Sequence, residues 1–187
     1  MELMDVIYAR RTVRGYTGKP VSREIIDKLL DAAVQAPTGM NAQPWAFGII
    51  EGVERLRDYS DRAKAYLLEH LDEFPGLERY RGMFEDPQQN LCYGAPACIV
   101  VYSRPGGATP VNDCTMAAQN IMLAACDMGL GSCWVGFLGF LLNQPDVKQA
   151  FGVPDDYQAL APIVIGYAAG ETSPVQKDPP QVLYRQE

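Results

Sequence analysis

Three arginines near the start of this acidic chain form the cluster with the clearest chemical use. Arg10, Arg11 and Arg14 lie within five residues of one another, and Thr12 stands between them. Guanidinium groups bind phosphate oxygens through paired hydrogen bonds, and a threonine hydroxyl adds a further donor. The same cations also suit the C-terminal end of a preceding helix, whose dipole they complement by about 0.3 to 1 kcal/mol. These residues alone support a phosphate clamp and a helix end equally.

Two uncharged segments offer further contacts. The loop from Pro37 to Trp45 carries hydroxyl and amide groups that can hydrogen-bond a neutral heterocycle, although Pro, Gly and Asn also mark an ordinary turn. The segment from Gly129 to Gly136 follows an apolar helical stretch, and its glycines permit close approach of a flat ligand or of another strand. A helix C-cap is the simpler explanation for Gly129 and Gly131. A Gly-x-Gly between a helix and a strand reverses the order of a dinucleotide fingerprint.

The composition argues against several other chemistries. The single histidine, His70, lies in a charged helical stretch, so we expect neither a His-based zinc site nor a Ser-His-Asp or Cys-His mechanism. The five cysteines show no Cys-x-x-Cys spacing and stand mostly in apolar runs, as buried free thiols do in a reducing compartment. The net charge of -7 repels phosphate backbones, so we expect neither nucleic acid nor an anionic membrane as a partner.

The chain has the features of one cytoplasmic domain. Its acidic start, Met1 to Asp5, lacks the basic region of a secretion signal. The longest uncharged run, Met128 to Pro145, is interrupted by glycines and is too short to span a bilayer. A length of 187 residues with 48% hydrophobic residues suits a single domain over residues 1–187.

The hydrophobic pattern predicts the elements that position these segments. Helices are predicted at 3–9, 22–36, 53–70, 77–92, 113–130 and 144–151, and strands at 45–50, 96–102, 132–137 and 159–167. The helix over 113–130 is apolar nearly all round, as is typical of a core or a subunit interface. The tail from Gly170 to Glu187 holds three prolines and few apolar side chains, so we expect it to lie on a partner subunit.

In their order and spacing these segments resemble the FMN-dependent nitroreductase family, which includes NAD(P)H nitroreductases and flavin reductase-like proteins. The matching segments cover nearly the whole chain and are residues 10–14, 36–39, 41–45, 118–125, 129–131 and 165–167. The resemblance implies an α+β fold: a three-layer sandwich whose central mixed or antiparallel sheet is flanked by helices. It also implies a homodimer that exchanges C-terminal arms and shares two FMN sites.

The resemblance further implies which residues bind FMN. Arg10, Arg11 and Thr12 would hold the phosphate, and Arg14 would lie near flavin N1 and O2, where a cation stabilises the charge of the reduced ring. Lys177 would replace the arginine pair that relatives often carry in the C-terminal arm. The residues implied to contact the ring and ribityl chain, partly across the dimer interface, or to approach the ring edge, are Pro37, Thr38, Gly39, Met40, Asn41, Gln43, Trp134, Val135 and Gly136.

The implied activity is that of an oxidoreductase with tightly bound FMN, no metal and no catalytic side chain. NADH or NADPH would deliver hydride to flavin N5, and a nitroaromatic, quinone or similar small molecule would then take the electrons in ping-pong order. Two alternatives stay open: a reductive dehalogenase or flavin-handling enzyme of the same fold, and a non-enzymatic protein that stores FMN. The segment from Arg55 to Asn90 shows no recognisable match and leaves the donor and acceptor undefined.

Overall fold

The computed structural model describes residues 1–186, and Glu187, the last residue of the predicted domain and tail, lies outside them. Four strands form one antiparallel sheet, in the order β1-β2-β4-β3. The sheet is therefore antiparallel throughout, one of the two arrangements expected. The strands are β1 (Trp45–Glu51), β2 (Ala97–Ser103), β3 (Gly131–Trp134) and β4 (Gln158–Gly166).

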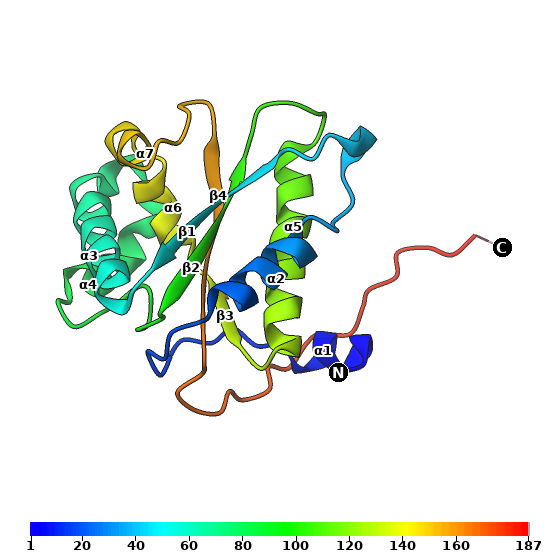
Figure 1. The fold of residues 1–187 in the computed structure, drawn as a ribbon. Helices are drawn as coiled ribbons and strands as arrows, with labels where there is room; N and C mark the ends of the chain where they lie inside the picture. The colour runs from blue at the N-terminus through cyan, green and yellow to red at the C-terminus, as the bar shows by residue number, and fades with distance from the viewer. Residues whose placement is uncertain (187) are drawn as a thin grey trace.

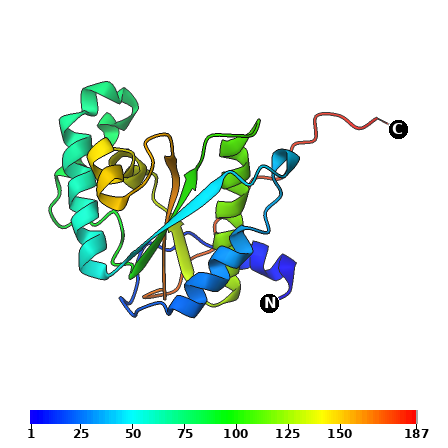
Figure 2. The ribbon, with the colours of Figure 1, turned by 45° about the horizontal axis from the view of Figure 1, so that its top comes forward.

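Helices cover both faces of this sheet (Figures 1 and 2). In the described part of the chain they are α1 (Leu3–Ala9), α2 (Arg23–Ala33), α3 (Val53–Glu69), α4 (Arg81–Glu85), α5 (Pro110–Asp127), α6 (Gly136–Leu142) and α7 (Pro145–Phe151). Helices α2 and α5 pack on one face, and α3, α6 and α7 on the other. The result is the α+β sandwich of three layers that the family resemblance implies.

Strand β2 lies in the middle of the core and is buried along its whole length. Because side chains alternate along a strand, Ile99 and Val101 contact the layer of α2 and α5, whereas Val100 and Tyr102 contact the layer of α3 and α6. A strand covered on both faces must be apolar at every position, which is why a continuous Ile/Val run marks it in the sequence.

Helix α5 is the long apolar helix of the prediction. Its inner face carries small side chains such as Ala117, Ala118 and Ala125, which let it lie close on the sheet. Its outer side retains exposed apolar residues, among them Val111 and Met116. The helix is therefore part of the core on one side. On its other side α1 contacts its C-terminal end, where Cys126 Sγ lies 3.9 Å from the carbonyl of Val6, and apolar side chains such as Val111 and Met116 stay exposed among the described residues.

Two predicted elements differ from the structure. The helix predicted at 77–92 is a 3-10 stretch at Pro75–Tyr80 followed by the short α4, because Asp86 precedes a proline and adopts an extended conformation. The strand predicted at 132–137 stops at Trp134, and helix α6 begins at Gly136. Short apolar runs do not distinguish a buried strand from a buried helix, and here the helix buries its leucines on one side.

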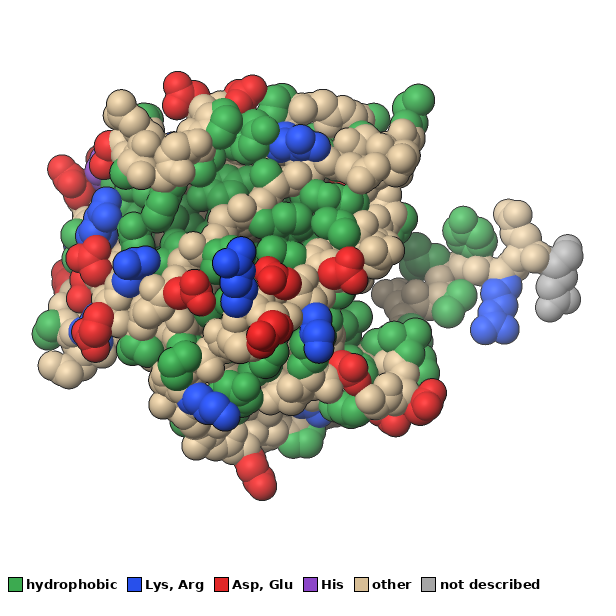
Figure 3. Space-filling view, in the orientation of Figure 1, with side chains coloured by type: hydrophobic (Ala, Val, Ile, Leu, Met, Phe, Trp, Pro, Cys, Tyr) green, Lys and Arg blue, Asp and Glu red, His purple; other side chains and the backbone are tan. Residues whose placement is uncertain are grey.

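The tail is extended and exposed from residue 170 to residue 186. Its first part lies beside residues 10–15, and Figures 1 and 3 show its last part standing clear of the rest of the molecule. Near its end Val182, Leu183 and Tyr184 are 60%, 81% and 77% exposed. Within residues 1–186, no helix is both long enough and apolar enough to cross a membrane.

Candidate functional site

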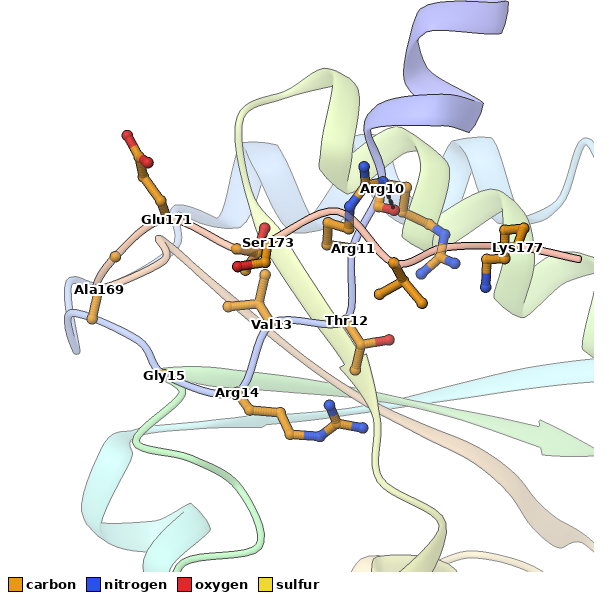
Figure 4. Close-up of a pocket in the computed structure, with 13 residues that line it drawn as sticks. Arg10, Arg11, Thr12, Val13, Arg14, Gly15, Ala169, Glu171, Ser173 and Lys177 are labelled. Atoms are coloured by element: carbon orange, nitrogen blue, oxygen red, sulfur yellow. Dashed lines mark hydrogen bonds between the residues drawn. The ribbon is translucent and has the colours of Figure 1, made fainter.

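A cationic cavity of about 640 Å³ lies between the segment after α1 and the chain after β4 (Figure 4). Its lining consists of residues 10–15 and 169–173 together with Val175 and Lys177. The structure thus brings together five residues predicted from the sequence: Arg10, Arg11, Thr12, Arg14 and Lys177. Figure 4 shows the Arg10 side chain extending toward Lys177, whereas Glu171, the acidic residue of the lining, points away from both.

Main-chain hydrogen bonds fix the segment that carries the arginines. The N–H of Val13 donates to the carbonyl of Ser132 at 3.0 Å, and the N–H of Ala169 donates to the carbonyl of Gly15 at 3.0 Å. The segment therefore runs as an extended chain between β3 and the residues after β4. Because side chains alternate along an extended chain, Val13 enters the core while Thr12 and Arg14 are exposed beside the cavity.

Gly129 and Gly131, which follow α5, have different structural roles. Gly129 has a φ of +72° directly after the last helical turn, as a helix C-cap requires. Gly131 leaves room for Val13, because a Cβ on it would lie 2.6 Å from Val13 Cγ2 and 2.7 Å from Val13 Cβ. The close neighbour of Gly131 is therefore another segment of this chain, and the helix-end explanation holds for Gly129 alone.

Arg11 combines the two uses proposed for the cluster. Its Nη1 donates to the carbonyls of Tyr8 at 2.6 Å and of Arg10 at 2.9 Å, so it completes the end of α1. Its Nε is buried and lacks a hydrogen-bond partner among the described residues. An unpaired buried donor beside a cavity is costly unless a ligand accepts from it. The donor set of this cavity therefore fits an anion such as a phosphate.

Tyr93 is a neighbour of the cluster that sequence reasoning missed. Burial raises the pKa of Tyr93, as does the nearby Cys133, while the adjacent guanidinium of Arg14 acts in the opposite direction. The phenol is consequently neutral at ordinary pH and lies beside the arginine implied to contact the flavin. Tyr93 has a φ of +57°. No sequence signal marks it, because a tyrosine in a segment without motifs has no pattern to match.

The other predicted contacts lie elsewhere in this chain. The loop over residues 37–43 sits at the N-terminal end of α5, where the N–H of Gly39 donates to Asp113 Oδ1 at 3.3 Å. Arg10 and Arg11 border Cys126 at the C-terminal end of the same helix. An 18-residue helix is about 27 Å long, and Figure 1 shows the two regions at its opposite ends. Within one chain, therefore, the arginines and the loop over residues 37–43 do not come together in one site.

Trp134 at the end of β3 and the two residues that follow it do not line the cationic cavity. Trp134 is half-buried, Val135 is buried and Gly136 is exposed at the start of α6. Gly136 borders a second cavity of about 320 Å³, which Tyr66, Phe140 and other residues line.

The loop at the N-terminal end of α5 holds an unusual backbone. Met40, Asn41 and Gln43 have φ values of 53°, 55° and 46°, although none of them is glycine. Left-handed residues of this kind cost about 1 to 3 kcal/mol each and gather at functional sites. The three occur within four residues, which makes this loop a functional candidate on geometry alone.

The cysteines and other metal-ligating side chains do not form a competing site. Among residues 1–186, no group of three or more His, Cys, Asp or Glu side chains is arranged to hold a metal ion. All five cysteines are free, and Cys126 is half-buried where the other four are buried. His70 stacks on Tyr66, with ring centroids 4.2 Å apart.

The three-layer fold and its cationic cavity agree with a match to the Nitroreductase family model over residues 7–167, and the chain belongs to that family. A protein of Methanothermobacter thermautotrophicus, provisionally named NADH dehydrogenase/NAD(P)H nitroreductase, is 30% identical, with 90% of this chain and 78% of that protein covered. Nitrobenzene nitroreductase of Ectopseudomonas oleovorans is 29% identical over 88% of this chain and 86% of that protein. A nitroreductase with bound FMN from Bacteroides fragilis superimposes with a TM-score of 0.86 at 26% identity, covering 100% of both chains.

Proposed function

We propose that this protein is an FMN-dependent oxidoreductase that takes hydride from NADH or NADPH and reduces nitroaromatics, quinones or similar electron-poor small molecules. The observation that carries the proposal is the cavity in which Arg10, Arg11 and Lys177 meet. The FMN named for the Bacteroides fragilis structure has a phosphate group that such a cavity suits. The activity named for the Ectopseudomonas oleovorans relative supports an aromatic nitro compound as acceptor.

The residues of the cavity would divide the binding of FMN between them. Arg10, Thr12 and Lys177 would hold the phosphate, and the unpaired Nε of Arg11 would donate to it. Arg14 would place its charge near the flavin pyrimidine ring, where it favours the negatively charged reduced form. FMN supplies the hydride-accepting and electron-donating chemistry when bound, so the protein needs no nucleophile or histidine base.

A homodimer would bring the two halves of the site together. If two copies pack with their α5 helices antiparallel, the loop over 37–43 of one copy comes beside the arginines of the other, and two equal sites result. The apolar outer side of α5 and the exposed Leu3 and Ile7 of α1 supply surface for such a contact. The exposed arm would lie on the partner. The four buried thiols suit a cytoplasmic location.

The first test is the visible absorption spectrum of the purified protein, followed without oxygen as NADH and then NADPH are added. We expect a flavin spectrum that bleaches rapidly before any acceptor is present, as ping-pong order demands, and that returns when nitrobenzene or a quinone is added. A protein that stores FMN would bind it and reduce it only slowly. A colourless protein that does not take up added FMN would refute the proposal.

Preference among acceptors separates the enzymatic alternatives. Halogenated tyrosines should oxidise the reduced protein more slowly than nitrobenzene does. The opposite order would make the protein a reductive dehalogenase. Loss of flavin absorbance that oxygen does not restore would instead indicate a flavin-degrading enzyme.

A further inference from the structure

The loop over residues 39–43, which contains the left-handed residues Met40, Asn41 and Gln43, is held at both ends by side chains that lie outside it. At one end, Asp113 Oδ1 accepts a hydrogen bond from the N–H of Gly39 at 3.3 Å. At the other end, Arg104 Nη2 donates to the carbonyl of Gln43 at 2.6 Å. Arg104 directly follows β2 and Asp113 lies in the first turn of α5, so both are fixed by the rigid core and not by the loop.

Asp113 is an unusual residue to bury. It is 2% exposed, and its Oδ1 also accepts from Thr109 Oγ1 at 3.2 Å. Its Oδ2 is buried without a hydrogen-bond partner among residues 1–186, as is the Nε of Arg104. The N-terminal end of α5 offsets part of the cost of the charge. A buried carboxylate with one unpaired oxygen still destabilises the fold, so stability alone does not account for an aspartate at this position.

The contact between loop and helix is also sterically close. A Cβ on Gly39 would lie 3.1 Å from Thr109 Oγ1, so only a glycine sits there without displacing its neighbour. Two hydrogen bonds also form within residues 38–43. Thr38 Oγ1 accepts from the N–H of Gln43 at 3.3 Å, and Asn41 Oδ1 accepts from Gln43 Nε2 at 3.0 Å. These internal bonds shape the turn, whereas the hydrogen bonds that join it to the core within residues 1–186 come from Asp113 and Arg104.

We propose that Asp113, assisted by Arg104, is a positioning residue of the FMN site. It holds the loop over residues 39–43 in the left-handed conformation that receives the flavin, so that FMN meets a preformed surface. The inference rests on the proposed function, because contact with FMN is the use assigned to this loop. Asp113 lies beneath the loop and acts through Gly39, not by touching the flavin.

Asp113→Ala should therefore weaken FMN binding without altering the flavin once it is bound. If the released loop keeps its binding shape in about one molecule in ten, the Kd for FMN rises about tenfold. The rate at which NADH reduces the bound flavin should stay within about twofold of wild type. Asp113→Asn keeps an oxygen that accepts from Gly39, so it should restore the affinity to within about threefold of wild type.

Lys148→Met is the matched control. Lys148 is 8% exposed, and its Nζ donates to the carbonyls of Asp155 at 2.5 Å and Tyr157 at 2.8 Å. It is thus another buried charge that holds a turn, in the helical layer on the opposite face of the sheet from α5. Its loss should lower the melting temperature but leave FMN affinity unchanged.

The experiment combines FMN titration with hydrogen exchange of the FMN-free protein. Support consists of a tenfold weaker Kd for Asp113→Ala, faster exchange confined to residues 38–44, and recovery of both in Asp113→Asn. A wild-type Kd for Asp113→Ala, or equal weakening by Lys148→Met, overturns the inference while the proposed function stands. A wild-type protein that does not bind FMN refutes the proposed function, and the inference with it. Should Asp113→Ala not fold, Arg104→Met tests the other end of the loop, and an unchanged Kd there overturns the inference.

Discussion

Replacement of Gly131 by alanine should disturb the cationic cavity from its buried side. The added Cβ would lie 2.6 to 2.9 Å from three carbons of the Val13 side chain. Since favourable carbon contacts begin at about 3.5 Å, Val13 has to move by up to about 0.9 Å. Val13 is buried and its N–H is bonded to Ser132, so the shift must pass to Thr12 and Arg14 on either side.

The size of the effect follows from the cost of overpacking. Extra atoms in a packed core cost about 1 to 3 kcal/mol. In a chain of this size each kcal/mol lowers the melting temperature by about 2 to 4 °C, so a loss of roughly 4 to 8 °C is expected for about 2 kcal/mol. FMN affinity should fall as well, because the donors on residues 10–14 no longer keep their spacing.

The assay is thermal denaturation of the FMN-free protein in a double-mutant cycle with Val13→Gly. All three close atoms belong to the side chain of Val13, so Gly131→Ala should cost nearly nothing in the Val13→Gly background, which gives a coupling energy of about 2 kcal/mol. Gly82→Ala in α4 is the control, since a Cβ there meets no atom within 4 Å. Equal costs of Gly131→Ala in the two backgrounds would refute the steric explanation.

Three further outcomes are expected. Arg10→Ala combined with Arg11→Ala should weaken FMN binding about 100-fold or more, through loss of charge-assisted hydrogen bonds, whereas Arg23→Ala, whose side chain is 93% exposed, should not change the Kd. Burial raises the pKa of Cys92 from 9.0 to about 12, so between these pH values the unfolded chain loses a proton that the folded chain keeps. The free energy of unfolding should therefore fall as pH rises, by up to about 1.4 kcal/mol per pH unit. Cys92→Ala should reduce the slope of melting temperature against pH. Removal of the arm from Pro174 onwards should increase the monomer fraction in size-exclusion chromatography and lower FMN affinity, and an unchanged dimer would show that the arm is not required.

Much of the fold is predictable because its signals are local. Strands β1, β2 and β4 contain short runs rich in Ile, Val and Ala. Ser22 caps α2 as its position suggests, since its Oγ accepts from the N–H of Ile25 at 3.4 Å. The arginine cluster is visible because three cations in an acidic chain are few and close together. The same approach does not predict helix α6 (Gly136–Leu142), because an apolar run interrupted by glycine has no clear period.

The other contacts of the site join residues that are far apart in the sequence, so no local sequence pattern indicates them. Asp113 looks in the sequence like an ordinary acidic residue in the first turn of a helix, where it favours the dipole. Its burial beneath the loop becomes visible only when α5 and residues 37–43 are packed together. Likewise, the arginines and the loop form one motif set in the sequence, yet the structure separates them by the length of α5.

If two copies pair through antiparallel α5 helices, as proposed above, the length of α5 sets the geometry of both sites. In an antiparallel pair, the span between one copy's arginines and the other copy's loop is set by the number of turns in this helix. A four-residue insertion in α5 would lengthen it by about 6 Å and move both sites out of register at once. Insertions between α3 and β2 or in the arm leave this span unchanged. Variation in chain length among related proteins should therefore collect in those segments, while the length of α5 stays constant.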